Sequence, residues 1–580
     1  MEGTWKPQKG VSRYRDTQAA IVGAGISGEP SDHARNQLSN TDGFPTLGIC
    51  MAIKLLEAGI KNIVIIEKSC GFGGTWRDNR YPGCRCDVPA HLYSFSFAPN
   101  PDWTRVYPDQ IEILEYLNKV AADHDLFRYT TFAAVVRRAE WDESSNKWLI
   151  DVEHQSSKDS EFERSFTITT DFLISAVGQL NVPYTPKIPG IESFQGKVMH
   201  TARWAHDTNL EGLRVGIIGN GATAVQIIPE VAQQTAKLTL FQRSPNWVMP
   251  RDDEEYPALT RFRLKYIPMA RSMYRVGLMK RGELFWESLT QKGTPMSEGL
   301  LQWCLGHMHS QLPGREDLWR KLTPEYAPGC KRILITNDFY PQLLRDNVDL
   351  ETATIREINE HGVILADGRT IDLDCLVLAT GFQTRDLLGS LSIQGVEKSQ
   401  TLQTRWQQEG VRTLYGVAAE GAPNFGMLYG PNTNLAHNSI ILMVEAQAKY
   451  IERLVSKVSS YRQAGRRLTV LPRPNRVREY NEYVQKQLSE TSFADNKCQS
   501  WYKTADGTIT NNWGGNVVDY QTMLSRLNWA DYDLEGPGTD TFASKAIDIG
   551  RVVEEKSSMG AWSVMATVGA MLGLFALFFN

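Results

Sequence analysis

Two glycine-rich turns constrain what this 580-residue chain can fold into. Residues 23–28 (Gly-Ala-Gly-Ile-Ser-Gly) follow the apolar run 19–22, and residues 219–224 (Gly-Asn-Gly-Ala-Thr-Ala) follow the apolar run 215–218. In a strand–turn–helix unit, such glycines let backbone N–H groups and the positive end of the helix approach a pyrophosphate. One such motif is a weak signal. Two of them, about two hundred residues apart, predict an α/β fold with two Rossmann-like dinucleotide-binding domains.

The residue that follows the second strand of each unit distinguishes the two sites. In the later unit the apolar run 237–241 is the expected strand, and Arg243 lies 19 residues after Ala224. An acid in this region binds a ribose 2′-hydroxyl, whereas an arginine suits a 2′-phosphate. In the first unit, Glu67 follows the strand 63–66. We therefore expect a flavin dinucleotide in the first unit and NADPH in the second, with a surface arginine as the alternative for Arg243.

The first unit contains a surplus segment, residues 29–48. Glu67 lies 39 residues after Gly28, whereas the usual spacing is about 20. The segment is polar, contains two prolines and lacks a helical period. Joining Gly28 directly to Ile49 restores an ordinary helix start and a spacing of 19 residues.

Two origins of this segment stay open. Suitable codons at its two ends, and at Ser39-Asn40, can contain splice-donor, acceptor and branch-site patterns, and excision would keep the reading frame. Our hypothesis is that residues 29–48 are a retained intron. The alternative is a genuine surface loop, because the cost of loop closure grows slowly with length. A genuine segment would interrupt the helix at the flavin site and weaken FAD binding.

Composition excludes several classes of protein. The net charge of −4 gives no sign of a nucleic-acid partner. Eight cysteines in a chain of this length do not form a disulfide framework, and the absence of a C-x4-C pair in the first unit argues against a disulfide reductase. Cys84 and Cys86 have no second pair at metal-ligand spacing, so we predict no metal site.

The C-terminal region predicts a membrane anchor. Residues 561–579 are uncharged and mostly apolar. At about 1.5 Å per residue they form just enough helix to cross a hydrocarbon core of about 30 Å. We expect residues 559–580 to be a single-pass tail anchor, joined by a flexible tether at 536–558, with the catalytic part in the cytosol. The alternatives are a helix docked on the core and a removable lipid-anchor signal.

The remaining segments predict the domain organisation. Residues 16–180 and 371–535 are expected to form the FAD domain, and residues 191–370 the NADPH domain. A helical insertion is predicted at 259–322 within the second domain.

Two longer motifs narrow the class. Phe194, Gly196, His200 and Trp204 form the pattern F-x-G-x3-H-x3-W, and residues 73–87 match [AG]-G-x-W-x4-[FY]-P-[GM]-x3-D. With these motifs the chain resembles the Baeyer–Villiger monooxygenases, from about residue 16 to residue 531. One departure is Ala205, where the family usually has Pro or Asp, and it leaves room for different oxygenation chemistry.

The resemblance implies a reaction. NADPH reduces FAD, dioxygen gives a flavin C4a-peroxide, and this attacks a ketone to form an ester or lactone. By the match of residues 326–332, Arg332 is the active-site cation, Asp87 is its acidic partner near the flavin, and Lys331 assists at the NADP 2′-phosphate. The substrate class implied is a secondary metabolite, bulky and apolar. The alternatives are oxygenation of an amine or sulfide, and an inactive membrane-anchored homologue without FAD.

The motif around His200 is expected to act as a hinge that couples NADP binding to domain movement, and we favour a structural histidine over a general base. The candidate FAD-binding residues are Gly23, Gly25, Gly28, Glu67, Gly74, Thr75, Trp76, Asp78, Asp87, Val88 and Tyr93. The candidate NADP-binding residues are Arg85, Cys86, Gly219, Asn220, Gly221, Ala222, Thr223, Ala224, Gln242, Arg243 and Lys331.

Overall fold

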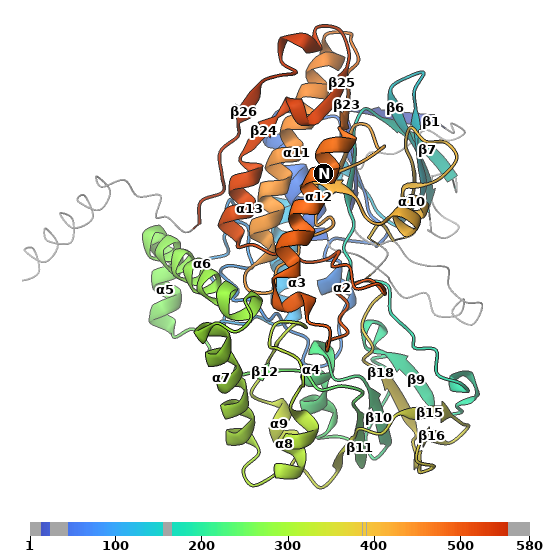
Figure 1. Ribbon diagram of the computed structural model, residues 1–580, viewed down its shortest axis with the longest axis vertical. Helices are drawn as coiled ribbons and strands as arrows, with labels where there is room; N and C mark the ends of the chain where they lie inside the picture. Colours follow the sequence, from blue (N-terminus) through green and yellow to red (C-terminus); the bar gives the residue numbers. More distant parts are fainter. Residues whose placement is uncertain (1–12, 24–44, 155–164, 385–386, 390, 555–580) are drawn as a thin grey trace, which may run out of the picture.

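The structure is a computed structural model that describes residues 13–23, 45–154, 165–384, 387–389 and 391–554. It contains two parallel sheets of five strands each, as the two glycine turns predict. The sheet of the second unit lies at the bottom of Figure 1, and the first unit with its long helices lies at the top. The α/β class is therefore confirmed.

The first dinucleotide sheet consists of short parallel strands. Their order is β22 (Phe425–Met427), β8 (Leu173–Ala176), β2 (Ala19–Gly23), β3 (Ile63–Ile66) and β4 (Thr130–Thr131). The three central strands are buried along their whole length, which is typical of a parallel sheet covered on both faces. Because β2 and β3 are parallel neighbours, their carboxyl ends, at Gly23 and Ile66, lie at the same edge of the sheet.

Helices cover one face of this sheet and a second sheet covers the other. The helices are α1 (Pro45–Glu57), α3 (Gln110–Asp123), α11 (Ile440–Gln463), α12 (Pro474–Ser489) and α13 (Val517–Leu524), and α1 packs directly against α11. The covering sheet has the order β1 (Arg13–Thr17), β7 (Ser165–Thr170), β6 (Lys147–His154), β5 (Ala134–Asp142) and β19 (Ser392–Gln394). Its apolar side chains form one buried cluster with those of β2 and β3.

Helix α1 begins inside the segment that the spacing marks as surplus. Residues 45–48 form its first turn, and Pro45 takes the first helical position, where a backbone N–H is not needed. A Cβ built on Gly48 would lie 3.6 Å from the Cα of Gly23, so Gly48 provides the close contact between helix and strand that Gly28 was expected to make. The prediction that all of residues 29–48 stand outside the helix is thus wrong for 45–48. Residues 24–44, including Gly25 and Gly28, lie outside the described residues.

The second dinucleotide sheet is also entirely parallel. Its order is β14 (Val348–Glu351), β11 (Lys237–Phe241), β10 (Arg214–Ile218), β18 (Cys375–Leu378) and β9 (Lys197–His200). Strand β18 lies between β10 and β9, so the predicted return to the FAD domain at residue 371 is one strand too early. A short apolar strand fits either parallel sheet, and its composition does not say which one it joins.

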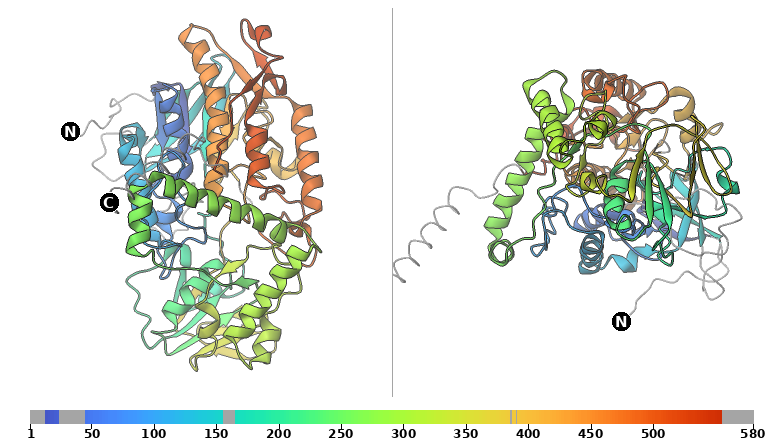
Figure 2. Two further views of the ribbon diagram at one scale, coloured as in Figure 1. Left: turned by 90° about the vertical axis from the view of Figure 1, so that its left-hand side faces the viewer. Right: turned by 90° about the horizontal axis from the view of Figure 1, so that it is seen from below.

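Four helices occupy the predicted helical insertion: α5 (Ala258–Tyr266), α6 (Pro268–Thr290), α7 (Pro295–Gln311) and α8 (Glu316–Leu322). Helix α6 crosses the front of the molecule in the left view of Figure 2. The smaller elements are α2 (Thr75–Asp78), α4 (Ala222–Val231), α9 (Phe339–Gln342), α10 (Leu402–Glu409), β12 (Val248–Met249), β13 (Leu334–Ile335), β15 (Ile355–Ile358), β16 (Gly362–Leu365), β17 (Thr370–Asp372), β20 (Thr413–Leu414), β21 (Ala418–Ala419), β23 (Thr469–Pro472), β24 (Arg526–Asn528), β25 (Tyr532–Glu535) and β26 (Ala546–Asp548).

Residues 536–554 are packed on the fold, so the predicted flexible tether is wrong over this range. Strand β26 pairs with β24. Phe542 packs edge-on against Trp529, with ring centroids 5.1 Å apart, and Glu554 forms an ion pair with Arg275 of α6. The sequence of this range is rich in charged residues, so its composition did not indicate these few apolar and ionic contacts. The predicted tail at 559–580 lies outside the described residues, and none of the described helices has the length and apolar character that a membrane span requires.

We predict that deleting residues 29–48 leaves the fold intact and increases the fraction of protein that carries bound FAD. The physical reason is that Gly28 then directly precedes Ile49, as Gly48 does in the structure. Flavin absorbance per protein and the melting temperature of both chains measure this. As a control, Gly28→Val in the shortened chain should lose flavin, because a branched Cβ would press on Gly23. A colourless shortened chain beside a yellow full chain would contradict the prediction.

Candidate active site

A cavity of about 890 Å³ is lined by residues of both dinucleotide domains. The predicted site residues that line it are Thr75, Trp76, Arg85, Cys86, Asp87, Val88, Tyr93, Gly219, Asn220, Gly221, Ala222, Thr223, Gln242, Arg243, Lys331 and Arg332. Predicted residues that do not line it are Gly23, Glu67, Gly74, Asp78, Ala224, Phe194, Gly196, His200 and Trp204. The structure thus brings most of the two candidate sets together, and their individual roles stay predictions.

The second glycine turn lies at the carboxyl end of β10, where α4 begins. Gly219 has φ +106°, and a Cβ there would lie 2.4 Å from the carbonyl oxygen of Ala379, so only glycine fits. A Cβ on Gly221 would meet no heavy atom within 4 Å, which leaves room beside the helix start. The amide of Asn220 donates to Gln242 Oε1 at 2.8 Å and to the Ser244 carbonyl at 3.0 Å. This turn is therefore held rigidly, with its open side toward the cavity.

Two cations meet at the end of β11, where a 2′-phosphate is expected. Arg243 is exposed, and Lys331 reaches the same place from another segment, with Nζ donating to Ser244 Oγ at 2.9 Å. Burial, and next the charge of Arg243, lower the pKa of Lys331 to about 8. A phosphate placed between these two groups would relieve their repulsion. The geometry agrees with the predicted roles of both residues.

The expected FAD site contains two buried hydroxyl groups without a hydrogen-bond partner among the described residues. The hydroxyls of Thr46 and Thr75 are buried, line the cavity and have no hydrogen-bond partner within the described part of the chain. Glu67 is buried at the end of β3, and its carboxylate accepts the N–H of Ser69 at 2.9 Å. Such donors, with an acid for the ribose, suit a flavin dinucleotide. The residues present therefore fit FAD.

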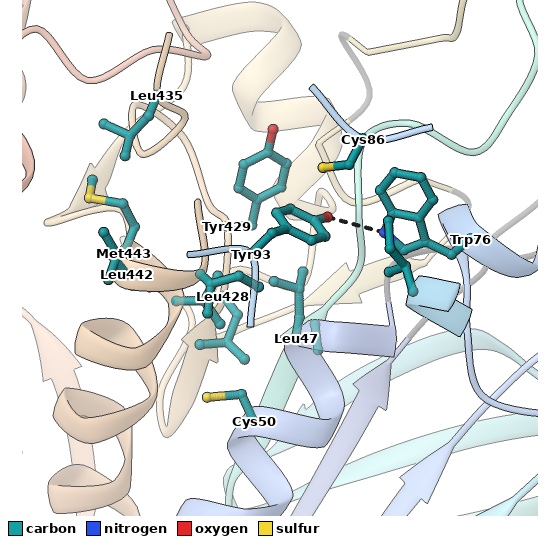
Figure 3. Packing of buried hydrophobic residues seen from close by; sticks show 14 of the residues in the cluster. Leu47, Cys50, Trp76, Cys86, Tyr93, Leu428, Tyr429, Leu435, Leu442 and Met443 are labelled. Atoms are coloured by element: carbon teal, nitrogen blue, oxygen red, sulfur yellow. Dashed lines mark hydrogen bonds between the residues drawn. The ribbon is translucent and has the colours of Figure 1, made fainter. Parts of the chain in front are cut away.

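Aromatic side chains form the wall of this first site. Trp76 Nε1 donates to the hydroxyl of Tyr93 at 3.1 Å, as Figure 3 shows, and the two rings meet edge-on with centroids 5.7 Å apart. Asp78 does not line the cavity, and its carboxylate accepts a hydrogen bond from the amide of Asn181 at 2.8 Å. Trp76 and Tyr93 thus act as packing surfaces, while Asp78 supports the turn that carries them.

An ion pair between the two domains lies in the cavity. Arg332, which comes from the NADPH domain, donates through Nε and Nη2 to Oδ2 of Asp87, each at 2.8 Å, and through Nη1 to the carbonyl of Ala436 at 3.1 Å. Burial alone would lower the pKa of Arg332, but the Asp87 carboxylate outweighs it, and the net pKa is raised. The cation is therefore permanent and fixed in direction. Such a group can stabilise negative charge on a reacting oxygen.

The predicted hinge motif, from Phe194 to Trp204, makes close contacts with its surroundings. A Cβ on Gly196 would lie 2.5 Å from the carbonyl oxygen of Asp374, and Phe194 is buried beside it. His200 ends β9, and its Nδ1 accepts the N–H of Ala202 at 3.1 Å. Burial, and then Arg203, lower the pKa of His200 to about 4, so the ring is neutral at pH 7. Trp204 packs at the edge of the main core. These contacts favour a structural histidine over a general base.

Gln226 is a contact residue that the sequence analysis missed. It lies on α4, accepts a hydrogen bond from the hydroxyl of Tyr81 at 2.9 Å and donates to the carbonyl of Arg85 at 3.0 Å. Gly83 has φ +76°, and a Cβ there would lie 2.4 Å from the Gln226 carbonyl. The FAD-side motif is thus fitted against the helix of the NADPH domain. The motif itself carries Tyr81 and Gly83, but nothing in the sequence points to their partner.

A disulfide lies directly beside Arg332. Cys330 and Cys498 are joined across 168 residues of sequence, and both are buried. The bridge ties the segment with Lys331 and Arg332 to the segment with Tyr502, which also lines the cavity. The expectation that the cysteines form no disulfide framework missed this pair. Two isolated cysteines so far apart give no pairing signal.

Comparisons with known proteins agree with this geometry. Residues 57–280 match the family described as flavin-binding monooxygenase-like. The chain is 42% identical over 557 residues to the FAD-binding monooxygenase ktnD of Aspergillus niger, covering 96% of this chain and 88% of the relative. It is 37% identical over 506 residues to a Baeyer–Villiger monooxygenase of Streptomyces coelicolor, covering 87% and 94%.

The chain belongs to the flavin-binding monooxygenases, in the group of the Baeyer–Villiger monooxygenases. Among solved structures, it is similar to an oxidised steroid monooxygenase bound to NADP, with a TM-score of 0.73, 27% identity, and coverage of 88% of this chain and 97% of that one. It is also similar to OTEMO in complex with FAD and NADP, with a TM-score of 0.73, 25% identity, and coverage of 90% and 99%. The predictions of family, enzyme class and both cofactors are confirmed.

The pKa of Lys331 predicts how NADPH binding depends on pH. Because this pKa lies near 8, below the ordinary lysine value, the side chain is cationic below pH 8 and loses its proton as the pH rises through that value. NADPH affinity should therefore fall between pH 7 and pH 9. A bound 2′-phosphate stabilises the cation and moves this pH range upward. Titration of the KM for NADPH measures this. In Lys331→Arg the profile should be flat, because the guanidinium stays charged, and an unchanged slope would contradict the assignment.

The disulfide predicts a loss of stability in Cys498→Ser. Removing a native bridge costs about 2–4 kcal/mol, because the unfolded chain gains freedom. The denaturation midpoint, measured with and without a dithiol reductant, should fall in the variant and become insensitive to reductant. Cys304→Ser is the matched control, because Cys304 is equally buried and free. Equal midpoints for the parent with and without reductant would show that the two thiols are not joined.

Proposed function

We propose that this chain inserts one oxygen atom from dioxygen beside a ketone carbonyl, giving an ester or lactone, with FAD and NADPH as cofactors. The observation that carries the proposal is the Arg332–Asp87 ion pair in a cavity shared by both dinucleotide sites. Bound FAD, reduced by NADPH, supplies the activation of dioxygen. The family of the chain supports the same reaction.

The protein's own groups have three tasks in this proposal. Arg332 faces the place where negative charge develops on the ketone oxygen as the new bond forms, and a fixed cation in a water-poor site lowers the energy of that charge. Asp87 is a positioning residue that directs the guanidinium. Apolar side chains of the cavity wall exclude water and favour a bulky, apolar ketone; they include Leu435, Ile440, Ile441, Val444 and Trp501.

The proposed biological setting is secondary metabolism in a fungus, at a membrane. The similar protein of the fungus Aspergillus niger supports the fungal setting, and the apolar cavity wall suits a bulky, apolar secondary metabolite. The apolar run 561–579 supports a C-terminal tail anchor with the catalytic part in the cytosol. The buried Cys330–Cys498 disulfide bears on that compartment, because disulfides are rare in the reducing cytosol. The redox state of this pair in protein taken directly from cells therefore tests the location.

Arg332→Ala should still allow flavin reduction by NADPH but lower ester formation by about a hundredfold or more, since a charge-stabilising donor is lost. Product analysis with a panel of ketones, together with the rate of NADPH oxidation, measures the two effects separately. Arg356→Ala is the control, because Arg356 is exposed and its ion pair within the described residues is with its neighbour Glu357.

Ester formation near the parent rate in Arg332→Ala would remove the role assigned to this residue. Flavin content and melting temperature of each variant show whether the fold is intact. If the parent oxidises an amine or sulfide but no ketone, the heteroatom alternative replaces the proposed reaction. If purified parent protein carries no flavin, the inactive-homologue alternative replaces it.

A further inference from the structure

Helix α5 presents its apolar side chains outward. Leu259, Phe262, Tyr266 and Ile267 expose 60%, 56%, 63% and 42% of their surface. Spacings of three and seven residues from Leu259 place Phe262 and Tyr266 on one face of the helix, and Ile267 follows directly after its last residue. An amphipathic helix of a soluble domain normally buries such a face, and only Leu264 of this helix is buried. A contiguous exposed apolar face marks an interaction surface.

The exposed face of α6 continues this character. Met273 and Leu284 expose 59% and 69% of their surface. Between them on the same helical face lies the exposed Lys280, and the exposed Arg263 stands on the apolar face of α5. The two helices project from one side of the molecule, away from both dinucleotide sheets (Figures 1 and 2). Apolar side chains combined with lysine and arginine are typical of helices that lie in the headgroup region of a bilayer.

The described chain ends against the same helix. Glu554 is its last described residue, and Glu554 Oε1 accepts a hydrogen bond from Arg275 Nη2 at 2.6 Å. Arg275 is buried, and its Nη1 also donates to Ser94 Oγ at 3.1 Å and to the carbonyl of His91. This buried ion pair fixes the point from which residues 555–580 continue. Glu554 precedes the apolar run 561–579 by seven positions in the sequence, and its own place on α6 is fixed by Arg275.

The inner face of α6 packs against a residue of the cavity wall. Asn438 lines the cavity, and its amide donates to Glu283 Oε1 at 2.9 Å. A Cβ on Gly282 would lie 2.6 Å from the Asn438 side chain, so α6 and the segment with Asn438 are in close contact. One side of α6 thus supports the cavity wall, while its other side carries the exposed apolar residues.

We propose that the α5–α6 face, defined by Leu259, Phe262, Tyr266, Ile267, Met273 and Leu284 with the cations Arg263 and Lys280, docks on the surface of a phospholipid bilayer containing anionic lipids. The catalytic part then lies flat against the membrane. This face is separate from the run 561–579 and from Arg332 and Asp87, and the test below distinguishes docking by this face from anchoring by the tail.

The test uses the full chain with a fluorophore on single cysteines. Cys70 is the cysteine that is exposed among the described residues, and Cys70→Ser removes its thiol. In that background, Phe262→Cys and Tyr266→Cys place the label on the α5–α6 face. Tyr483→Cys is the matched control, because Tyr483 on α12 is 54% exposed and Phe262 is 56% exposed. Each labelled protein is mixed with vesicles of phosphatidylserine and brominated phosphatidylcholine, which quenches fluorophores at the acyl boundary.

We expect the fluorescence at positions 262 and 266 to fall about twofold or more on vesicle binding, with no loss at position 483. Protein that floats with the vesicles but shows no quenching at 262 and 266 would overturn the proposal, because the tail alone would then hold it. Failure to float would overturn it too. A fluorescence change at 262 that depends on protein concentration without vesicles would assign the face to a second copy of the chain instead.

Discussion

The ion pair between Arg332 and Asp87 is the contact on which the active site depends. The arginine comes from the domain with the second glycine turn and the aspartate from the motif beside the first, so this pair of charges joins the two cofactor sites. Buried charges are tolerated only when they are well paired, and here the Ala436 carbonyl adds a further acceptor. Any movement of one domain relative to the other must therefore keep or replace this partnership. The Gln226 contacts with Tyr81 and Arg85 hold the same interface farther from the reaction site.

Local patterns in the sequence predicted the parts of the fold that depend on backbone geometry. Gly219 indicated a turn that only glycine can form, and the strand-end residues Arg243 and Glu67 indicated which cofactor each unit prefers. Their positions at the carboxyl ends of parallel strands follow from the βαβ topology. The family motifs then indicated Arg332 and Asp87, which are 245 residues apart in sequence and 2.8 Å apart in space.

Other features depend on long-range contacts and could not be predicted in this way. Strand β18 joins the NADPH sheet because of its neighbours, not because of its own composition. Cys498, the partner of Cys330, and the cavity residue Tyr502 come from a segment with no motif of its own. The region after residue 535 is charged overall, yet Phe542, Ile549 and Glu554 are enough to hold it on the fold. In each case a few contacts outweigh the average character of the segment.

The first turn of α1 has a consequence for the proteins that one gene can encode. Residues 46–48 (Thr-Leu-Gly) precede Ile49 in the structure, whereas residues 26–28 (Ile-Ser-Gly) would precede it after excision of 29–48. Each triplet ends in glycine, and Gly48 lies against Gly23 of β2. A gene whose transcript is spliced in both ways would therefore place the hydroxyl of Thr46 before Ile49 in one protein and the hydroxyl of Ser27 in the other. The flavin affinities of the two proteins would then depend on which hydroxyl that turn carries.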